Sequence, residues 1–131
     1  MTGAEEWRPV VGWEGLYEVS NQGRVRSLDR AYDRPASRRR PQPWRRVYRG
    51  RMIKPAPTSA GYLVVNLHRS NSRLMRLVHC LALEAFVGPP PPGMIGLHWD
   101  DDPNNNRLAN LRWGTRRDNW QDAVRNRAAA S

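Results

Sequence analysis

The stretch MIGLHWDDDPNNNRLANLRWGTRRDNWQDAVRNR, residues 94–127, decides the fold. Residues 94–98 are mainly apolar up to a histidine and predict a short strand, and residues 107–114 predict a second one. The loop between them, residues 99–106, is rich in Asp and Asn, which favour turns. Four prolines between Gly88 and Gly93 separate this unit from the chain before it.

A helix should follow the second strand directly. Thr115 and Asp118 have the spacing of a capping box, with Asp in place of the more usual Glu or Gln. The helix is therefore expected to begin here and to run to about Arg127. The order strand, loop, strand, helix then places His98 on the first strand and Asn119 in the first turns of the helix.

From Glu6 to about Leu28, short runs of apolar residues alternate with turn residues. Val25 should face inward between the outward-facing Arg24 and Arg26, the alternation of a half-buried strand. Apolar residues between Leu77 and Phe86 lie on one face of an expected short helix. Strands are expected at residues 7–11, 16–19, 24–28, 51–54, 62–67 and 74–78. The fold class is therefore α+β, with a small antiparallel β module followed by a strand–strand–helix core.

The charge balance predicts a polyanionic partner. The 131 residues carry a net charge of +10, and Lys54 is the only lysine among 22 basic residues. The planar guanidinium group of arginine donates several hydrogen bonds to phosphate, so duplex DNA or RNA is the expected class of partner. A genome that favours arginine codons would explain arginine in place of lysine, but it would not explain the net charge.

The remaining totals exclude several classes of protein. The single cysteine, Cys80, excludes an internal disulfide and a Cys-Cys zinc ribbon. No apolar run approaches the ~20 residues of a membrane span. The acidic start, Glu5 and Glu6, is unlike a signal peptide, so the expected location is cytoplasmic, without membrane association.

Residues 29–50 are rich in proline and arginine and show little periodicity. The run Ser37 to Pro41 indicates a mobile basic arm or loop that could follow a phosphate backbone, or else a linker without defined contacts. The expected organisation is thus an amino-terminal β module (1–28), a basic insert (29–50) and a third region (51–131) with its core at about 94–127.

The residues of the core suit phosphodiester hydrolysis, which needs a water nucleophile, a base and positive charge near the developing oxyanion. A neutral histidine such as His98 can act as that base. Mg²⁺ prefers oxygen ligands and retains several waters, so one or two protein oxygens suffice. Asn119, on a helix packed against the histidine strand, can present its carbonyl oxygen to such an ion.

Two ordered motifs resemble one known family. The first joins His98-x-Asp100 to Asn105-Asn106-Arg107-Leu108-x-Asn110-Leu111-x-Trp113-x-Thr115 and Asp118-Asn119, and the run Val78-His79-x-Leu81-Ala82 precedes it. It resembles the HNH (His-Me finger, ββα-metal) motif of phage and intron-encoded endonucleases. The second motif, Trp7-x-Pro9-Val10-x-Gly12-x-Glu14-Gly15-Leu16-Tyr17, resembles the amino-terminal module of such homing-type nucleases.

The resemblance implies a metal-dependent DNA endonuclease that nicks or cuts double-stranded DNA and leaves 5′-phosphate and 3′-hydroxyl ends. It implies His98 as the general base, Asn119 as a ligand of Mg²⁺, Mn²⁺ or another divalent cation, and Asn110 as the middle residue of the catalytic motif. Asn110 is expected to hold the loop by hydrogen bonds, so that His98 points correctly. Asn105 and Asn106 are expected to act as turn residues. The resemblance also suggests a phage, intron or prophage origin, hence host cytoplasm if phage-encoded.

One departure from the family concerns the residue before the base. Many relatives have an aspartate or another ligand there, whereas this chain has Leu97, which cannot bind a cation. Three explanations stay open: Asn119 alone holds the metal with DNA phosphates and water; Asp100, or less readily Asp101 or Asp102, supplies a second oxygen; or the nuclease is weak or inactive.

The expected DNA contacts are made by arginines of the first module, the insert and the core. They are Arg24, Arg26, Arg38, Arg39, Arg40, Arg45, Arg46, Arg112, Arg116 and Arg117. The alternatives to a nuclease are a DNA-binding protein of the same fold without catalysis, and an RNA-binding basic protein whose tryptophans and tyrosines stack on bases. Both a monomer and a homodimer are compatible with the sequence. We expect no helix-turn-helix module of the kind that some relatives carry, so recognition is expected to be loose or to depend on the first module and the arm.

Overall fold

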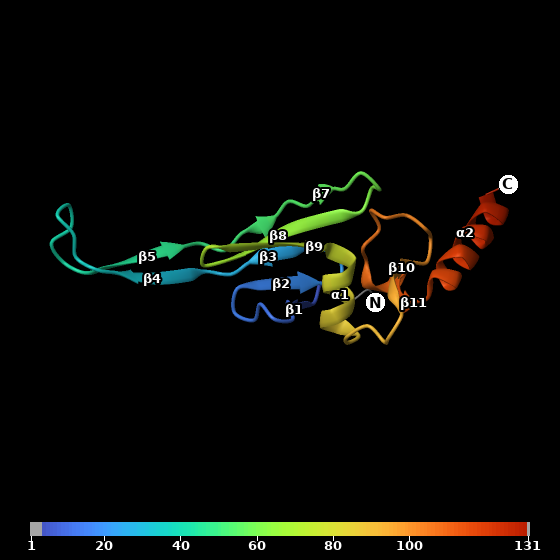
Figure 1. The fold of residues 1–131 in the computed structure, drawn as a ribbon, viewed down its shortest axis with the longest axis horizontal. Coiled ribbons are helices and arrows are strands. Elements are labelled where there is room, and N and C mark those ends of the chain that lie inside the picture. The colour runs from blue at the N-terminus through green and yellow to red at the C-terminus, as the bar shows by residue number, and fades with distance from the viewer. Residues whose placement is uncertain (1–3, 131) are drawn as a thin grey trace.

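The computed structural model describes residues 4–130. Its strands form four antiparallel sheets, which two helices and one 3-10 turn accompany (Figure 1). The first sheet has the order β1-β2-β3-β6, and the others are the pair β4-β5, the sheet β7-β8-β9 and the pair β10-β11. The strands are β1 Trp7–Pro9, β2 Tyr17–Ser20, β3 Val25–Ser27, β4 Arg30–Arg34, β5 Trp44–Tyr48, β6 Met52–Ile53, β7 Ala56–Pro57, β8 Leu63–Arg69, β9 Ser72–Leu77, β10 Ile95–His98 and β11 Leu111–Gly114. The helical elements are α1 Val78–Phe86, η1 Leu108–Asn110 and α2 Arg116–Ala130. The expected α+β class is confirmed.

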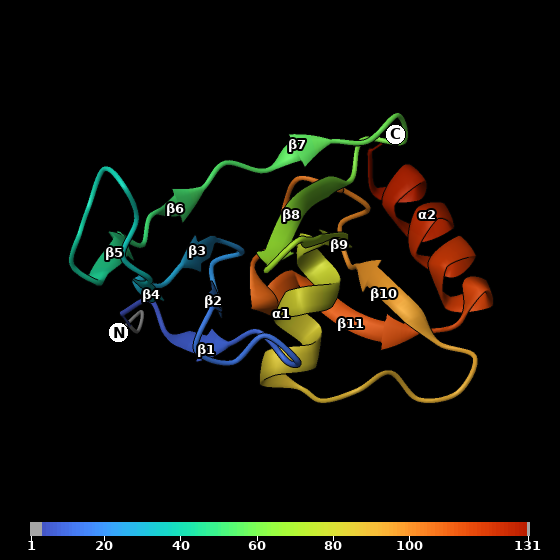
Figure 2. The ribbon, with the colours of Figure 1, turned by 60° about the vertical axis from the view of Figure 1, so that its left-hand side comes forward.

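The core forms around α1, which contacts strands of both halves of the chain (Figure 2). Leu81, Ala82 and Leu83 are fully buried on this helix, where they meet the inward residues of the sheets. Burial of this apolar surface is the main force that joins the amino-terminal sheet to the β10-β11 unit. The packed core consists of Val10, Trp13, Tyr17, Val19, Val25, Val65, Leu67, Val78, Leu81, Ala82, Leu83 and Leu111.

Residues 29–50 are more ordered than their sequence indicates. β4 and β5 pair in register from Arg30 opposite Tyr48 to Arg34 opposite Trp44, and the ribbon projects from one end of the molecule (Figure 1). Cross-strand aromatic contact supports it, because the rings of Tyr32 and Tyr48 meet edge to face at 5.9 Å. The insert is thus a two-stranded arm with a turn at its tip.

The carboxyl-terminal unit follows the expected order of strand, loop, strand and helix. The capping box is confirmed: the Thr115 amide donates to Asp118 Oδ2 at 2.9 Å, and the Asp118 amide donates to Thr115 Oγ1 at 3.1 Å. These bonds lower the pKa of Asp118. Residues 108–110 form a 3-10 turn in place of the first part of the expected second strand, and the helix continues to Ala130. Neither helix in the described part of the chain is long and apolar enough to cross a bilayer.

Candidate active site

A hollow of about 220 Å³ lies between the end of β10 and the first turns of α2. It brings together His98 and Asn119, which are 21 positions apart in the chain. The antiparallel pairing of β10 with β11, with His98 opposite Leu111, returns the chain so that α2 packs against β10. The residues that line this His98 hollow are Ala60, Tyr62, Ile95, Gly96, Leu97, His98, Asp101, Pro103 and Asn119.

His98 is 5% exposed, and its ring forms a hydrogen bond with the side chain of Asn106. The distance from His98 Nε2 to Asn106 Oδ1 is 2.8 Å. Because an amide oxygen only accepts, Nε2 carries the hydrogen and Nδ1 is the basic nitrogen of the neutral ring. Among residues 4–130, Nδ1 has no hydrogen-bond partner, so it is available to accept a proton.

A second histidine lies against the first. The ring centroids of His79 and His98 are 4.6 Å apart, and Tyr62 lies 5.6 Å from His79 and 6.0 Å from His98. Burial, and then repulsion from His98, lowers the pKa of His79 to about 4. His79 is therefore neutral at physiological pH, as a buried packing residue should be, and it places no positive charge beside His98.

Asn106 is held by contact with the amino-terminal module. A Cβ on Gly23 would lie 2.6 Å from the Asn106 carbonyl oxygen, and Gly23 has a φ of 81°, which glycine adopts readily. The Leu108 amide donates to the Asn21 carbonyl at 2.9 Å in the same region. The turn of the first module thus supports the residue that orients His98. The sequence indicates only a turn role for Asn106, since nothing local reveals this contact.

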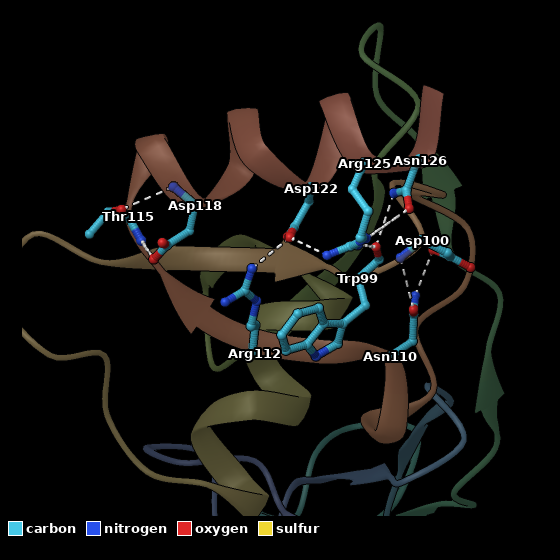
Figure 3. Close-up of polar contacts among 9 residues, drawn as sticks. All are labelled: Trp99, Asp100, Asn110, Arg112, Thr115, Asp118, Asp122, Arg125 and Asn126. Carbon is cyan, nitrogen blue, oxygen red and sulfur yellow. Dashed lines mark hydrogen bonds and ion pairs between the residues drawn. The ribbon is translucent and has the colours of Figure 1, made fainter. Parts of the chain in front are cut away.

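Asn110 and Asp100 close the loop after His98 (Figure 3). Asn110 Nδ2 donates to Asp100 Oδ1 at 2.8 Å and to the Asn105 carbonyl at 2.9 Å, and Asn110 Oδ1 accepts from the Asp100 amide at 3.2 Å. The expected loop-holding bonds of Asn110 are therefore present. Burial acts to raise the pKa of Asp100, but hydrogen bonds from Asn105, the Asp102 amide and Asn110 lower it overall.

A buried carboxylate joins α2 to β11 and to the residue after His98 (Figure 3). Asp122 is 1% exposed and its Oδ1 accepts from Arg112 Nη2 at 2.7 Å and from Arg125 Nη1 at 2.9 Å. The Arg112 guanidinium lies 3.7 Å from the Trp99 ring centroid, and Asn126 Nδ2 donates to the Trp99 carbonyl at 3.0 Å. These contacts of Asp122, Arg112, Arg125, Trp99 and Asn126, here called the clamp, fix α2 relative to β11. They therefore also fix Asn119 relative to His98. The sequence did not reveal this role of Asp122, because its partner Arg112 lies on β11 and only the fold brings it to α2.

Oxygen donors are available for a hydrated divalent cation. Asn119 lines the His98 hollow, and its side-chain amide has no partner among the described residues. Asp101 lines the same hollow, whereas Asp100 is engaged within its loop. Within residues 4–130, no three His, Cys, Asp or Glu side chains converge to hold an ion. An amide oxygen, a carboxylate and water form the kind of donor set that Mg²⁺ accepts, so these residues fit such an ion.

The arginines expected to contact DNA fall into three groups. Arg24, Arg26, Arg45 and Arg112 form ion pairs with Glu5, Glu18, Asp33 and Asp122, respectively. The pairing with Arg24 lowers the pKa of Glu5 to about 2. Arg40 and Arg46 lie over the rings of Trp44 and Tyr48. Arg38, Arg39, Arg116 and Arg117 are exposed and form no ion pair within the described residues, although Arg117 lies close enough to Asp118 to lower its pKa. The last group is the most available for phosphate.

A basic cleft that the sequence did not reveal lies between the first sheet, the β4-β5 arm and the β7-β8-β9 sheet. It has a volume of about 1190 Å³ and no acidic residue in its lining. Arg34, Arg51 and Lys54 line it, and within residues 4–130 their side chains have no ion-pair partner. Its lining extends to Thr58, two positions before Ala60 of the His98 hollow.

Comparison with known proteins gives the family. Residues 5–68 match the NUMOD4 motif, and residues 76–121 match an HNH endonuclease family. The chain is 28% identical over 119 residues to the DNA endonuclease I-HmuI of Bacillus phage SP01, covering 91% of this chain and 58% of that protein.

A solved structure agrees with the sequence comparison. The structure described as DNA binding and cleavage by the HNH homing endonuclease I-HmuI matches with a TM-score of 0.66 and 26% identity, over 91% of this chain and 57% of that one. This chain thus spans somewhat more than half the length of the relative. The motifs, the fold and the two family matches agree: residues 76–121 belong to the HNH endonuclease family, and a NUMOD4 motif precedes them at residues 5–68.

Proposed function

We propose that this chain is a divalent-metal-dependent DNA endonuclease with His98 as the general base. The observation that carries the proposal is the presence of His98 and Asn119 in one hollow, on the strand and the helix of an HNH region. The similarity to a DNA endonuclease over 91% of the chain supports DNA as the substrate.

Each residue of the site has a defined task. His98 Nδ1 takes a proton from water, Asn106 holds the ring through Nε2, and Asn110 keeps the following loop closed. The water oxygen bonds to phosphorus as the bond to the 3′ oxygen breaks, and the leaving 3′ oxygen takes a proton from solvent water, which leaves 5′-phosphate and 3′-hydroxyl ends. When bound at Asn119, the divalent cation supplies positive charge for the scissile phosphate and the leaving oxygen.

The basic cleft and the free arginines provide a path for duplex DNA. Arg34, Arg51 and Lys54 would neutralise phosphates along the cleft, and Arg116 and Arg117 would do so at the start of α2, next to Asn119. The projecting β4-β5 arm carries Arg38 and Arg39 at its tip, where they could follow the backbone further.

DNA binding without hydrolysis is the second candidate, and Leu97 favours it. Leu97 is buried and offers no oxygen beside His98. This candidate predicts salt-dependent binding and no cleavage with any divalent ion.

Conversion of supercoiled plasmid to the open circle distinguishes the two candidates. We expect cleavage with Mg²⁺ or Mn²⁺, and a loss of about 10²–10⁴-fold in the rate for His98→Ala, the range of a positioned general base. The variant should retain plasmid binding in a gel-shift assay, which separates chemistry from affinity. Cleavage at the parent rate by His98→Ala would refute the assignment of the base.

A further inference from the structure

Leu97, the residue before His98, lines the hollow but supplies no side-chain oxygen to it. Its side chain is 2% exposed and packs toward Gly114, where an added Cβ would lie 2.6 Å from Leu97 Cδ1. The Leu97 side chain fills this space with hydrocarbon. Water or an ion could therefore enter it only if the contact between β10 and β11 opened. A second protein oxygen for a cation held at Asn119 would therefore come from another residue.

Asp100 is poorly suited to supply that oxygen. Its Oδ1 accepts from Asn110 Nδ2 at 2.8 Å and from the Asp102 amide at 2.9 Å, and its Oδ2 accepts from Asn105 Nδ2 at 2.8 Å. Asp100 also does not line the hollow. Turning it toward a cation would break three bonds that hold the loop closed after His98. The carboxylate is committed to the loop.

Asp101 is placed differently. It lines the His98 hollow together with His98 and Asn119, and its amide donates to the His98 carbonyl at 3.0 Å. Its φ of 60° turns the chain at this residue, in a conformation that Asp and Asn tolerate better than most side chains. Within residues 4–130 its carboxylate has no hydrogen-bond partner. Asp101 thus offers a free carboxylate at the mouth of the hollow, on a backbone tied to His98.

Asp102 provides the contrast within the same acidic run. Its Oδ1 accepts from the Asn104 amide at 3.0 Å, and the residue is exposed outside the lining of the hollow. The three consecutive aspartates therefore have three separate positions: one closes the loop, one faces the hollow and one caps the following turn.

We infer that Asp101 replaces the missing donor at position 97, and that its carboxylate and the Asn119 carbonyl oxygen bind the same divalent cation. The inference rests on the proposed function for the presence of that cation. One charged carboxylate oxygen and one amide oxygen suit Mg²⁺ or Mn²⁺. Water and DNA phosphate would fill the remaining coordination positions of the ion. The carboxylate comes from the loop after His98 and not from the strand before it.

Mn²⁺ binding to the full chain without DNA tests this inference, independently of cleavage. Paramagnetic broadening of backbone amide signals reports even weak binding, and signals around residues 96–102 and 117–121 should broaden first. Asp101→Asn keeps the size of the side chain and tolerates the same φ, whereas Asp102→Asn removes the same charge one residue away. We expect Asp101→Asn to raise the Mn²⁺ concentration at the midpoint at least tenfold, and Asp102→Asn to leave it within about twofold.

The outcomes separate the two proposals. An unchanged midpoint in Asp101→Asn, or an equal shift in both variants, would overturn the role of Asp101, since a general effect of charge would then explain the binding. Loss of Mn²⁺ binding in Asp101→Asn but not in Asp102→Asn supports the role of Asp101. If the parent protein then cuts no plasmid, only the proposed function fails. Matching amide spectra without Mn²⁺ would establish that both variants are folded.

Discussion

Removal of the Asp122 carboxylate is the sharpest test of how α2 is held. In Asp122→Ala, Arg112 and Arg125 lose the oxygen that lies 2.7 and 2.9 Å from them, and their charges stay beside each other. Breaking a fully buried ion pair from one side costs about 3–5 kcal/mol. Here the Arg112 side chain is 27% exposed and that of Arg125 is 48% exposed, so water partly compensates the charges left behind.

The expected loss in the free energy of unfolding is therefore about 2–3 kcal/mol, below the full cost of a buried pair. For a domain of this size, it corresponds to a decrease in Tm of roughly 8–12 °C. Urea unfolding followed by tryptophan fluorescence measures it, because Trp99 lies under the Arg112 guanidinium. An unchanged m-value would show that only stability has changed.

Asp33→Ala is the matched control. Asp33 pairs with Arg45 on the arm, where the two side chains are 85% and 65% exposed, and such a pair contributes little. We expect no measurable change in this variant. If Asp122→Ala were as stable as Asp33→Ala, the clamp would not hold α2, and the reasoning from burial would be wrong.

Two further predictions concern pH and DNA. The free energy of unfolding should fall by about 3 kcal/mol as the pH decreases from 6.5 to 4, because the unfolded chain binds a proton at His79 in this window whereas the folded pKa is about 4. His79→Gln should lose that part of the pH dependence in urea titrations, and an identical slope would contradict it. In fluorescence anisotropy with duplex DNA between 50 and 200 mM salt, the double variant Arg51→Ala, Lys54→Ala should reduce the salt slope by about 1–2. Arg73→Ala, an exposed cation outside the basic cleft, should have a smaller effect, and an equal reduction would remove the cleft from the DNA path.

The carboxyl-terminal fold could be predicted because its signals are local. The capping box at Thr115 and Asp118 acts within one turn of helix, and the proline run acts on the backbone of its own residues. The arm at residues 29–50 was harder, because its pairing depends on contacts between strands ten or more residues apart. Its periodicity is weak where arginines occupy both faces of an exposed ribbon.

The order of the elements also predicted that His98 and Asn119 would approach each other, and the structure places them in one hollow. It did not predict the supports around them. Asn106, which bonds to His98, lies against the Gly23 turn of the first module, and Asp122 on α2 bonds to Arg112 on β11. Gly23 is far from Asn106 in the sequence, and Arg112 lies on a different element from Asp122. Neither contact therefore follows from a local sequence pattern.

The sequence by itself determined the class of the fold, the basic character of the chain and the residues of its HNH region, because spacing, caps and net charge act locally or as totals. Only the tertiary structure decided which of the neighbouring aspartates faces the hollow and which arginines are free for phosphate. Side-chain direction in a loop depends on each residue's φ and on hydrogen bonds, so Asp100 and Asp101 differ in position although they are adjacent. An arginine is free only where folding brings no carboxylate to it, and long-range packing settles that.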